Sequence, residues 1–303
     1  MENSFFNNTE SFEIYLKQRL EGRIASPLIL EIQPTSVCNH NCIFCVSKKA
    51  RTSGGEISWP MIKRLICDAA ESKTAIVRFC GGGEPLMHPH ICDILNKCAA
   101  LKIKTEITTN GTLFNDTLID IASRCCDHIR ISVDAGNAAT YSRIHNVNAR
   151  IYQALWDSIY KLSRVRERTG GPTIELSFVL HDLNIDSLPI FLEKAQKARV
   201  DGITVTTNII EDHQLSHALY KSAKLTLSNK IKKEENNIRL NWAHDDSFLH
   251  DTKLLCPLVL LYGVITPTGD FYPSCHHIAS GRHLLGNIYS ISSIRSILKE
   301  DKI

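Results

Sequence analysis

The sequence predicts an α/β fold in which parallel strands alternate with helices. From residue 28 to residue 207, short β-branched or apolar runs alternate with longer amphipathic segments. The residues with unusual chemistry follow the ends of these runs. Alternation of this kind implies right-handed crossovers between parallel strands, in a sheet or barrel that binds ligands at the carboxyl ends of its strands.

The expected elements follow one another in a regular order. Residues 10–22 carry apolar side chains among charges and predict a short surface helix. Strands are predicted at residues 28–32, 75–80, 103–108, 129–133, 173–180 and 203–207. Helices are predicted near residues 60–72, 90–101, 115–125, 149–168 and 186–199. Ser58 before Trp59-Pro60 is typical of a helix start, and Gly170-Gly171-Pro172 ends the longest helix.

Chemically distinctive loops follow the first four predicted strands. Residues 38–45 are rich in cysteine, residues 81–85 read Gly-Gly-Gly-Glu-Pro, residues 109–111 read Thr-Asn-Gly, and Asp134 follows the fourth strand. Because the carboxyl ends of parallel strands lie on one edge, we expect these loops on a common rim.

The composition is that of an ordinary globular protein. The 303 residues are 43% hydrophobic and 22% charged, with a formal net charge of +3. No apolar run reaches the roughly 18 residues of a membrane span, and the start MENSFFNNTE lacks the features of a signal peptide. We therefore expect a cytoplasmic protein with no membrane partner. Glu234 and Glu235 close the basic stretch at 221–233, which favours a solvated helix face over a nucleic-acid surface.

Because the cytoplasm is reducing, we expect the 11 cysteines to serve as metal ligands, catalytic thiols or core residues and not to form disulfides. Cys38, Cys42 and Cys45 are spaced CxxxCxxC in one short polar loop, so their sulfurs can converge on one metal. Structural zinc needs four ligands, for which His40 is a candidate, although a residue between two ligands is usually directed away. A [4Fe-4S] cluster accepts three cysteines and leaves one iron open. The spacing favours the cluster, with zinc as the alternative.

Four motifs in the expected order resemble those of the radical S-adenosylmethionine (SAM) superfamily. CNHNCIFC at 38–45 is similar to its CxxxCxxC signature, including the aromatic Phe44, and GGEP at 82–85 is similar to its glycine motif. TNG at 109–111 and ISVD at 131–134 resemble the ends of its third and fourth strands. The resemblance covers roughly residues 28–210.

The resemblance implies a partial (β/α)6 barrel with a [4Fe-4S] cluster on Cys38, Cys42 and Cys45. SAM would bind through its methionyl amine and carboxylate and be cleaved to methionine and a 5′-deoxyadenosyl radical, which abstracts hydrogen from a substrate. A reducing partner such as a flavodoxin or ferredoxin is implied as well.

The resemblance also suggests which residues contact SAM. Gly82 and Gly83 would let backbone approach the cofactor, and Pro85 would fix the loop that aims Glu84 at the SAM amine. Ser132 and Arg143 are candidate partners of the SAM carboxylate. Asn110 and Asn208 are candidates for contact with the substrate or the ribose. Phe44 would shield the cluster or touch the adenine. A surface salt bridge for Arg143 and a core role for Phe44 stay open.

The C-terminal part resembles the start of the SPASM or shortened twitch extension of the same superfamily. Cys256-Pro257, Gly269, Pro273 and Cys275 carry this resemblance, with LGNI at 285–288. It implies a hairpin around Gly269, flanked by two cysteines that bind an auxiliary iron-sulfur cluster.

The later cysteines that complete such a site are missing before Ile303. Three roles for Cys256 and Cys275 therefore stay open: ligands of an auxiliary cluster completed by His276, His277 or a remote cysteine, a thiol hydrogen donor, or packing residues. We expect three parts in the chain, a helical lead-in at 1–27, the barrel at 28–210 and the extension at 211–303, whose residues 211–240 are polar and helix-like.

The predicted function is radical epimerisation or dehydrogenation of a small polar substrate, such as an aminoglycoside, an aminocyclitol or a sugar-like molecule. Short chains with a reduced extension resemble such enzymes of antibiotic pathways. One alternative is a maturase that epimerises or crosslinks a ribosomally made peptide, against which stands the lack of an N-terminal domain for a leader peptide. A second alternative is a zinc-binding interaction module. No basic and aromatic patch supports a nucleic-acid partner.

Overall fold

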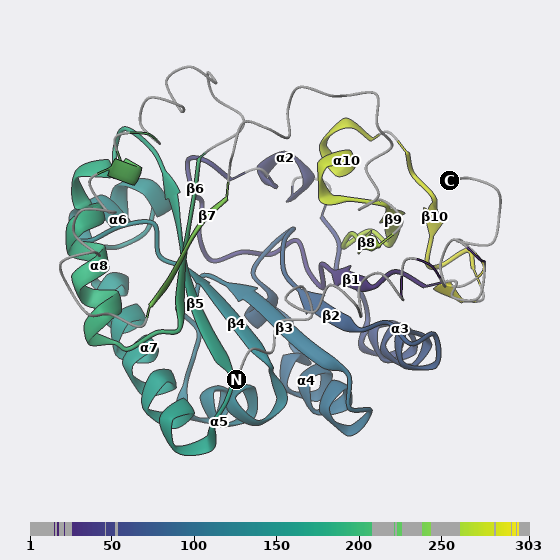
Figure 1. Cartoon of the computed structure of the whole chain (residues 1–303). Coiled ribbons are helices and arrows are strands. Elements are labelled where there is room, and N and C mark those ends of the chain that lie inside the picture. Colours follow the sequence, from purple (N-terminus) through teal and green to yellow (C-terminus); the bar gives the residue numbers. More distant parts are fainter. Residues whose placement is uncertain are drawn as a thin grey trace. The chain divides into compact units, whose positions relative to one another are not determined.

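The computed structural model describes residues 15, 17, 21, 26–45, 47–51, 54–207, 221, 223–225, 238–243, 261–281, 283–291, 293–294 and 296. The chain divides into two compact units. The first unit comprises Met1–Val37, Lys49–Thr105 and Thr252–Ile303, and the second comprises Cys38–Lys48 and Glu106–Asp251. Both units combine strands and helices, as predicted for an α/β fold (Figure 1).

The first unit has the strand order β10-β9-β8-β1-β2. Strand β1 (Ile29–Ile32) is parallel to both β2 (Ile76–Phe79) and β8 (Tyr262–Ile265). Strands β9 (Asp270–Tyr272) and β10 (Gly286–Asn287) extend this sheet in antiparallel fashion. Its helices are α3 (Trp59–Glu71), which Ser58 and Pro60 begin as predicted, α4 (Ile91–Ala100) and α10 (Cys275–Ser280), with a 3-10 turn η2 at Pro85–Met87. The short helix α2 (Lys48–Arg51) lies at the boundary of the two units.

The second unit has the strand order β3-β4-β5-β6-β7, with every paired neighbour parallel. The strands are β3 (Lys104–Thr109), β4 (His128–Ser132), β5 (Thr173–Leu180), β6 (Gly202–Thr207) and β7 (Arg239–Ala243). Helices α5 (Asp116–Cys125), α6 (Ala138–His145), α7 (Arg150–Thr169) and α8 (Leu188–Lys197) connect them, with a 3-10 turn η3 at Ile185–Ser187. These helices lie along one side of the strands (Figure 1).

Side-chain alternation gives the strands of the second unit two different faces. On β4, Ile129 and Ile131 are fully buried, whereas Arg130 and Ser132 between and after them are only partly buried. The apolar face packs on the helices, because the ring of Phe178 on β5 lies 5.0 Å from the ring of Phe191 on α8, centroid to centroid. Successive side chains of a strand point to opposite faces, so the polar residues lie on the face away from the helices.

The predicted fold class is confirmed, and the predicted strands agree with the observed ones to within two residues at each end. The hairpin around Gly269 is also confirmed, with φ of +86° at that glycine. The helix-like assignment up to residue 240 is wrong at its end, because Arg239–Ala243 forms a strand parallel to β6. Strand β8 is the first strand of the confirmed hairpin, and its parallel pairing with β1 was not predicted. The boundaries at residues 27 and 210 stay predictions.

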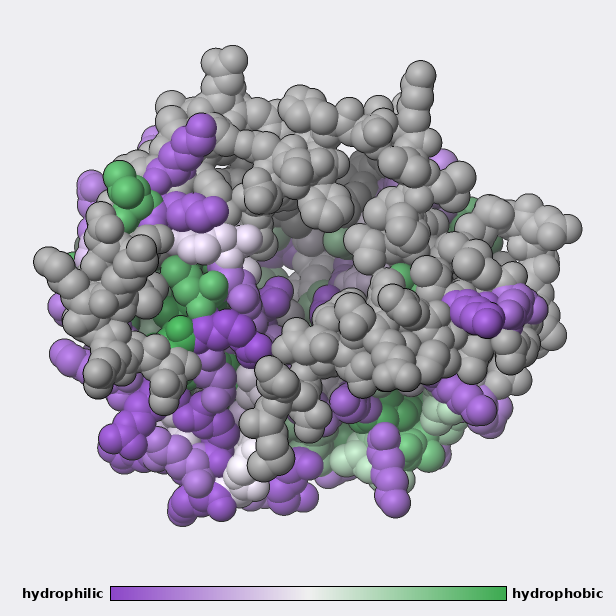
Figure 2. Space-filling view, in the orientation of Figure 1, coloured by the Kyte–Doolittle hydropathy of each residue, from purple (hydrophilic) through white to green (hydrophobic). Residues whose placement is uncertain are grey.

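Little of the lead-in helix expected at 10–22 lies within the described residues. Tyr15 is helical and 6% exposed, and it packs against Leu28, Ile29, Ile76 and Leu261. On the face seen in Figure 2, the described surface is mostly hydrophilic, and its apolar patches are separate from one another. Within the described part of the chain, no helix is long and apolar enough to cross a membrane.

Trp156 should be a major contributor to the stability of the second unit. It is 1% exposed, and its ring lies 6.4 Å from Phe191 and 6.3 Å from Tyr152, centroid to centroid. Trp156→Ala should lower the free energy of unfolding by about 3–5 kcal/mol, because it leaves a cavity in a packed core. Urea denaturation followed by circular dichroism measures this change. Ile190→Ala, at a position that is 43% exposed, should change it by about 0.5 kcal/mol or less, and equal losses in both variants would contradict the assignment.

Candidate active site

The cysteine loop, residues 38–45, lies between β1 and α2 and carries all three predicted metal ligands, each half-buried. One flank of the loop is bonded to the turn that follows β3. The Asn110 amide donates to Asn39 Oδ1 at 2.7 Å, and Asn39 Nδ2 donates to Thr112 Oγ1 at 2.9 Å. The predicted proximity of the loops after the first and third strands is therefore present, and Asn110 is one of the residues that creates it.

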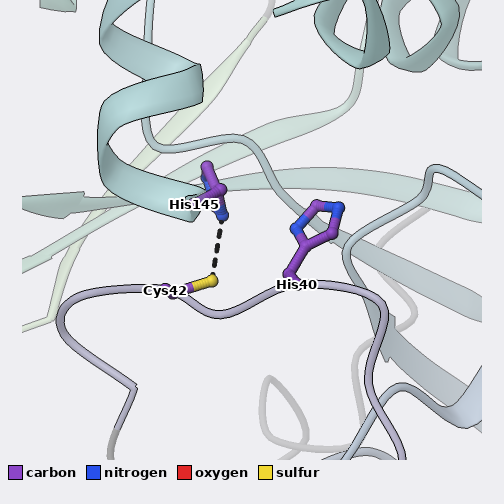
Figure 3. A group of neighbouring side chains, drawn as sticks. All are labelled: His40, Cys42 and His145. Carbon is purple, nitrogen blue, oxygen red and sulfur yellow. Dashed lines mark hydrogen bonds between the residues drawn. The ribbon is translucent and has the colours of Figure 1, made fainter. Parts of the chain in front are cut away.

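The last turn of α6 holds the other flank of the loop. The Asn41 N–H donates to the His145 carbonyl oxygen at 3.1 Å, and the Ile43 N–H donates to the Ile144 carbonyl oxygen at 2.9 Å. Between these two bonds, Cys42 Sγ lies 3.1 Å from His145 Nδ1 (Figure 3). The last carbonyls of a helix have no partner within the helix. The loop amides satisfy two of them and place the Cys42 sulfur beside the imidazole.

The His145 ring is fixed on all sides in the second unit. It is 1% exposed, and its Nε2 lies 3.1 Å from the Val133 carbonyl oxygen. The rings of Tyr141 and Phe44 pack against it at centroid distances of 4.2 and 6.0 Å. Burial, and then the charge of His40, lowers the pKa of His145 to about 3, although the bond to Val133 opposes this.

Asp134 follows β4 and faces the same ring. Its Oδ2 lies 3.5 Å from His145 Nε2, and its Oδ1 accepts the Val179 N–H at 2.7 Å. The carboxylate is 1% exposed, and burial raises its pKa to about 7, although the bond from Val179 lowers it. The residue at the fourth predicted rim position is thus part of the surroundings of the cysteine loop.

The surroundings of Cys42 oppose its ionisation. Burial raises the pKa of Cys42, and negative charges on Asp134, Cys45 and Cys38 raise it further. A thiolate in such surroundings becomes favourable when a positively charged metal centre binds it. Cys38, Cys42 and Cys45 are the residues that would hold such a centre.

His40, the zinc-ligand candidate between the cysteines, is 3% exposed, and burial lowers its pKa to about 4. Its Nε2 lies 3.5 Å from Thr112 Oγ1, and its ring centroid lies 5.3 Å from that of His145. Ligand atoms of His40, Cys42 and His145 lie within 4.8 Å of one another (Figure 3). Two imidazoles and a thiolate would suit a single zinc ion, so this group is the feature that favours the zinc alternative.

The glycine motif of the first unit packs on the chain segment just before the cysteine loop. The Gly83 and Glu84 N–H groups donate to the carbonyl oxygens of Thr35 and Val37, both at 2.8 Å. A Cβ on Gly83 would lie 2.1 Å from the Val37 carbonyl oxygen. The glycines are predicted to admit a cofactor, and the structure adds a second reason for them, because the chain's own backbone fills the space beside Gly83.

Glu84 and Pro85 form the start of η2. Glu84 is 3% exposed, and its Oε1 accepts the Leu86 N–H at 3.0 Å, as an N-cap does. The motif is therefore held by its own capping bond as well as by the bonds to residues 35 and 37.

The structure places the other predicted site residues as follows. Phe44 contacts the His145 ring, and Ser132 ends β4, where its Oγ accepts a bond of 3.3 Å from Ser177. Arg143 is exposed on α6 and donates to the Leu183 carbonyl oxygen. Cys275 is exposed at the start of α10. Asn208 and Cys256 lie outside the described residues.

Three residues around the cysteine loop were not predicted from the sequence, and His145 is the first of them. It lies 103 positions beyond Cys42 and outside every recognised motif. Asn39 and Thr112 were missed too, although polar residues directly beside a metal-binding loop and a Thr-Asn-Gly turn are a usable signal.

Comparison with known proteins gives a family match and several relatives. The family model of the Radical SAM superfamily matches residues 32–195. The chain is 28% identical over 170 residues to a probable GTP 3',8-cyclase of Thermoplasma volcanium, a match that covers 55% of this chain and 50% of that protein. It is 20% identical over 306 residues to the mycofactocin maturase MftC of Mycobacterium tuberculosis, which covers 95% of this chain and 74% of that one.

Solved structures share the fold. SuiB of Streptococcus suis bound to S-adenosylmethionine matches with a TM-score of 0.75 and 16% identity, over 99% of this chain and 73% of that one. SuiB bound to its precursor peptide SuiA matches with a TM-score of 0.76 and 18% identity, over 100% of this chain and 72% of that one.

Gly83→Ala should destabilise the first unit. The added methyl group would overlap the Val37 carbonyl oxygen, and relief of such overpacking typically costs about 1–3 kcal/mol. Urea denaturation of the variant measures this loss. Gly202→Ala is the matched control, because its Cβ would meet no atom closer than 3.4 Å, and its stability should be near that of the original chain. A Gly83→Ala variant with unchanged unfolding would contradict the packing described here.

Proposed function

The chain belongs to the radical SAM superfamily, and from that membership we propose that it abstracts hydrogen from a small polar substrate, leading to epimerisation or dehydrogenation. Aminoglycosides, aminocyclitols and sugar-like molecules are the expected class. The observation that carries the proposal is a row of neutral polar side chains on the face of the second unit that is turned away from its helices.

This row follows directly from the strand register. Ser132 pairs with Ser177, Ser177 with Thr204, and Thr204 with Asn241, so β4 to β7 each present a hydroxyl or an amide at one level. Ser132 and Ser177 are partly buried, Asn241 is exposed, and Thr204 is buried and bonded to Glu175. Hydroxyl and amide groups both donate and accept hydrogen bonds. Such a row is suited to a substrate that carries several hydroxyl or amino groups.

On β4 and β5, the positions two residues before this row form a lower level of charged side chains that are paired with each other. Arg130 contacts Glu175 at 2.8 Å, and Thr204 donates to Glu175 at 2.7 Å. Burial opposes the ionisation of Glu175, but bonds from His128 and the charge of Arg130 lower its pKa to about 2. Because this carboxylate is already paired, the neutral level above it is the better place for substrate contacts.

The superfamily uses a [4Fe-4S] cluster and SAM, and Cys38, Cys42 and Cys45 are the residues that would hold the cluster. When bound, the cluster supplies the electron that cleaves SAM to methionine and a 5′-deoxyadenosyl radical. A flavodoxin or ferredoxin is the proposed class of reducing partner. Among the chain's own residues, Asn110 and the end of α6 hold the loop, and Cys42 contacts His145.

SAM itself would be bound by residues of the predicted rim. Gly82–Pro85 supply backbone near the start of the cysteine loop, and the bonds to residues 35 and 37 support this role. Ser132 and Asn110 are proposed next, because each lies at the end of its strand. Phe44 is proposed because it belongs to the cysteine loop and packs on the His145 ring, whereas the exposed position of Arg143 gives it the weakest support. Asn208 is proposed on sequence alone.

Peptide maturation is the second candidate. The similarity to the mycofactocin maturase spans 95% of this chain, and SuiB shares the fold and is solved with its precursor peptide. A row of hydroxyls and amides would also bond to an extended peptide backbone. This candidate therefore uses the same face of the second unit for a different substrate.

The proposed role of Cys275, with Cys256, is to decide the fate of the substrate radical. Cys275 is exposed at the start of α10. As ligands of an auxiliary cluster they would serve a dehydrogenase, which must pass on an electron. As a thiol hydrogen donor, one of them would serve an epimerase.

The anaerobically reconstituted protein should cleave SAM to 5′-deoxyadenosine and methionine when dithionite is supplied. Aminoglycosides, aminocyclitols and synthetic peptides are then added in heavy water, and the products are followed by mass spectrometry. Dehydrogenation removes two hydrogen atoms, and epimerisation introduces one deuterium. Conversion of a small polyhydroxy compound supports the first candidate, and conversion of peptides alone replaces it with the second.

Cys42→Ala is the control for the cluster, since two cysteines do not hold it firmly. It should abolish SAM cleavage. A colourless protein that binds zinc and cleaves no SAM would favour the zinc module instead.

Counting iron should separate the roles of Cys256 and Cys275. A second [4Fe-4S] cluster predicts about eight irons per chain, whereas the loop cluster alone predicts about four. With a second cluster, Cys275→Ala should lower the count from about eight to about four while SAM cleavage persists. Cys67→Ala, at a half-buried helix cysteine of the first unit, is the matched control and should leave the count unchanged. A wild-type count near four contradicts the auxiliary cluster.

A further inference from the structure

The helical side of the second unit carries a groove between α5 and α7, apart from the face that is proposed to bind the substrate. The two helices pack side by side (Figure 1), and the groove between them has a volume of about 720 Å³. Ile119 on α5 and Val165 on α7 are its apolar lining residues, and the other residues that line it are polar or charged.

We propose that this α5–α7 groove is the docking surface for the reducing partner, an electron-transfer protein with an acidic surface. The proposal rests on the proposed function, because it needs the loop cluster as the acceptor of the electron. One electron leaves the redox centre of the partner, which is oxidised, and the loop cluster is reduced.

The first support is a surplus of positive charge in the groove. Its lining includes two aspartates and four basic residues. Both aspartates are already paired within the groove. Asp116 contacts Lys161 at 2.9 Å, and Asp120 contacts Arg124 at 2.9 Å. The two basic residues that remain have no carboxylate of the groove left to pair with.

These two residues are Arg164 and Arg168, both exposed on α7. Neither has a hydrogen bond or an ion pair with any of the described residues. Side chains four positions apart are neighbours on a helix, and like charges at this spacing repel each other. Carboxylates of a partner would relieve this repulsion, since arginine binds a carboxylate through two parallel N–H bonds. A partner with acidic side chains around an apolar one therefore complements this groove.

The second support is the position of the groove relative to the cysteine loop. The groove reaches Asp116, the first residue of α5, which lies only four positions after Thr112. Thr112 Oγ1 accepts the 2.9 Å bond from Asn39 of the cysteine loop. Electron transfer between proteins requires that their redox centres come close together. A partner seated at this end of the groove is held next to the segment that supports the loop.

The test measures binding first and electron transfer second. The double variant Arg164→Glu, Arg168→Glu reverses the two charges of the groove. The matched control is Lys63→Glu, Lys197→Glu, because both lysines are exposed on helices and do not line the groove. The probes are flavodoxin and ferredoxin, each tested separately with the reconstituted protein. Biolayer interferometry with the oxidised probe at low ionic strength gives the Kd, and SAM cleavage is then compared between the reduced probe and dithionite as electron donors.

We expect at least one probe to bind the original chain, and its binding should weaken as salt is added. The groove variant should bind this probe about tenfold or more weakly, because like charges then face each other across the interface. At limiting concentrations of the reduced probe, its SAM cleavage should fall to a similar extent. With dithionite, its SAM cleavage should match that of the original chain, and the lysine control should match it with both donors.

Unchanged affinity of the groove variant for a probe that binds the original chain would overturn the proposal. So would equal weakening in the lysine control, or failure of both probes to bind the original chain. If the charge-reversed variant does not fold, Arg164→Gln, Arg168→Gln decides the matter, because unchanged affinity in that variant would overturn the proposal as well. Failure of the original chain to cleave SAM with dithionite would instead count against the proposed function.

Discussion

The arrangement of the site depends on one electrostatic constraint, that the Cys42 thiol must be kept buried in a loop that carries two further thiols. Burial and neighbouring negative groups raise the pKa of Cys42, so the loop would gain by spreading apart. The structure resists this by fastening the loop on two flanks. Asn110 bonds Asn39, and the end of α6 bonds residues 41 and 43. Asn110 follows β3, and α6 follows β4, which is parallel to β3.

This explains why parallel strands suit such a site. Parallel crossovers bring loops from distant parts of the sequence to the same end of a sheet, and each loop needs only one or two hydrogen bonds to restrain its neighbour. The glycine motif illustrates the point, because Gly83 allows backbone contact that any side chain would block. Glu84, which caps η2, then fixes the direction in which the chain leaves. Local turn chemistry and tertiary contact are satisfied by the same few residues.

The sequence was sufficient for features that depend on local pattern. Short β-branched or apolar runs located the strands from Ile29–Ile32 to Gly202–Thr207. Motif spacing located the cysteine loop and the glycine motif. The sequence could not locate β7 or the pairing of β8 with β1, because both depend on strand edges that only the folded sheet offers. His145 could not be predicted for the same reason. It lies 103 residues beyond Cys42, and the two meet only because the end of α6 packs on the cysteine loop.

Under the proposed function, substrate contacts on Ser177, Thr204 and Asn241 are separate from the groups that hold Cys42, and Ser132 lies at the border between SAM and substrate. The cysteine loop and its supports lie at the strand ends and are bonded to backbone, so their geometry does not depend on the side chains of the strand interiors. The row from Ser132 to Asn241 is set by register alone. Substitutions there can change hydrogen-bonding groups without moving Cys42, because successive strand positions point to opposite faces. The charged level of Arg130 and Glu175 supports this division, since its ion pair closes the region below with groups that are already satisfied. Under the proposed function, a fold organised in this way retains one means of making a radical while the residues that contact the substrate change.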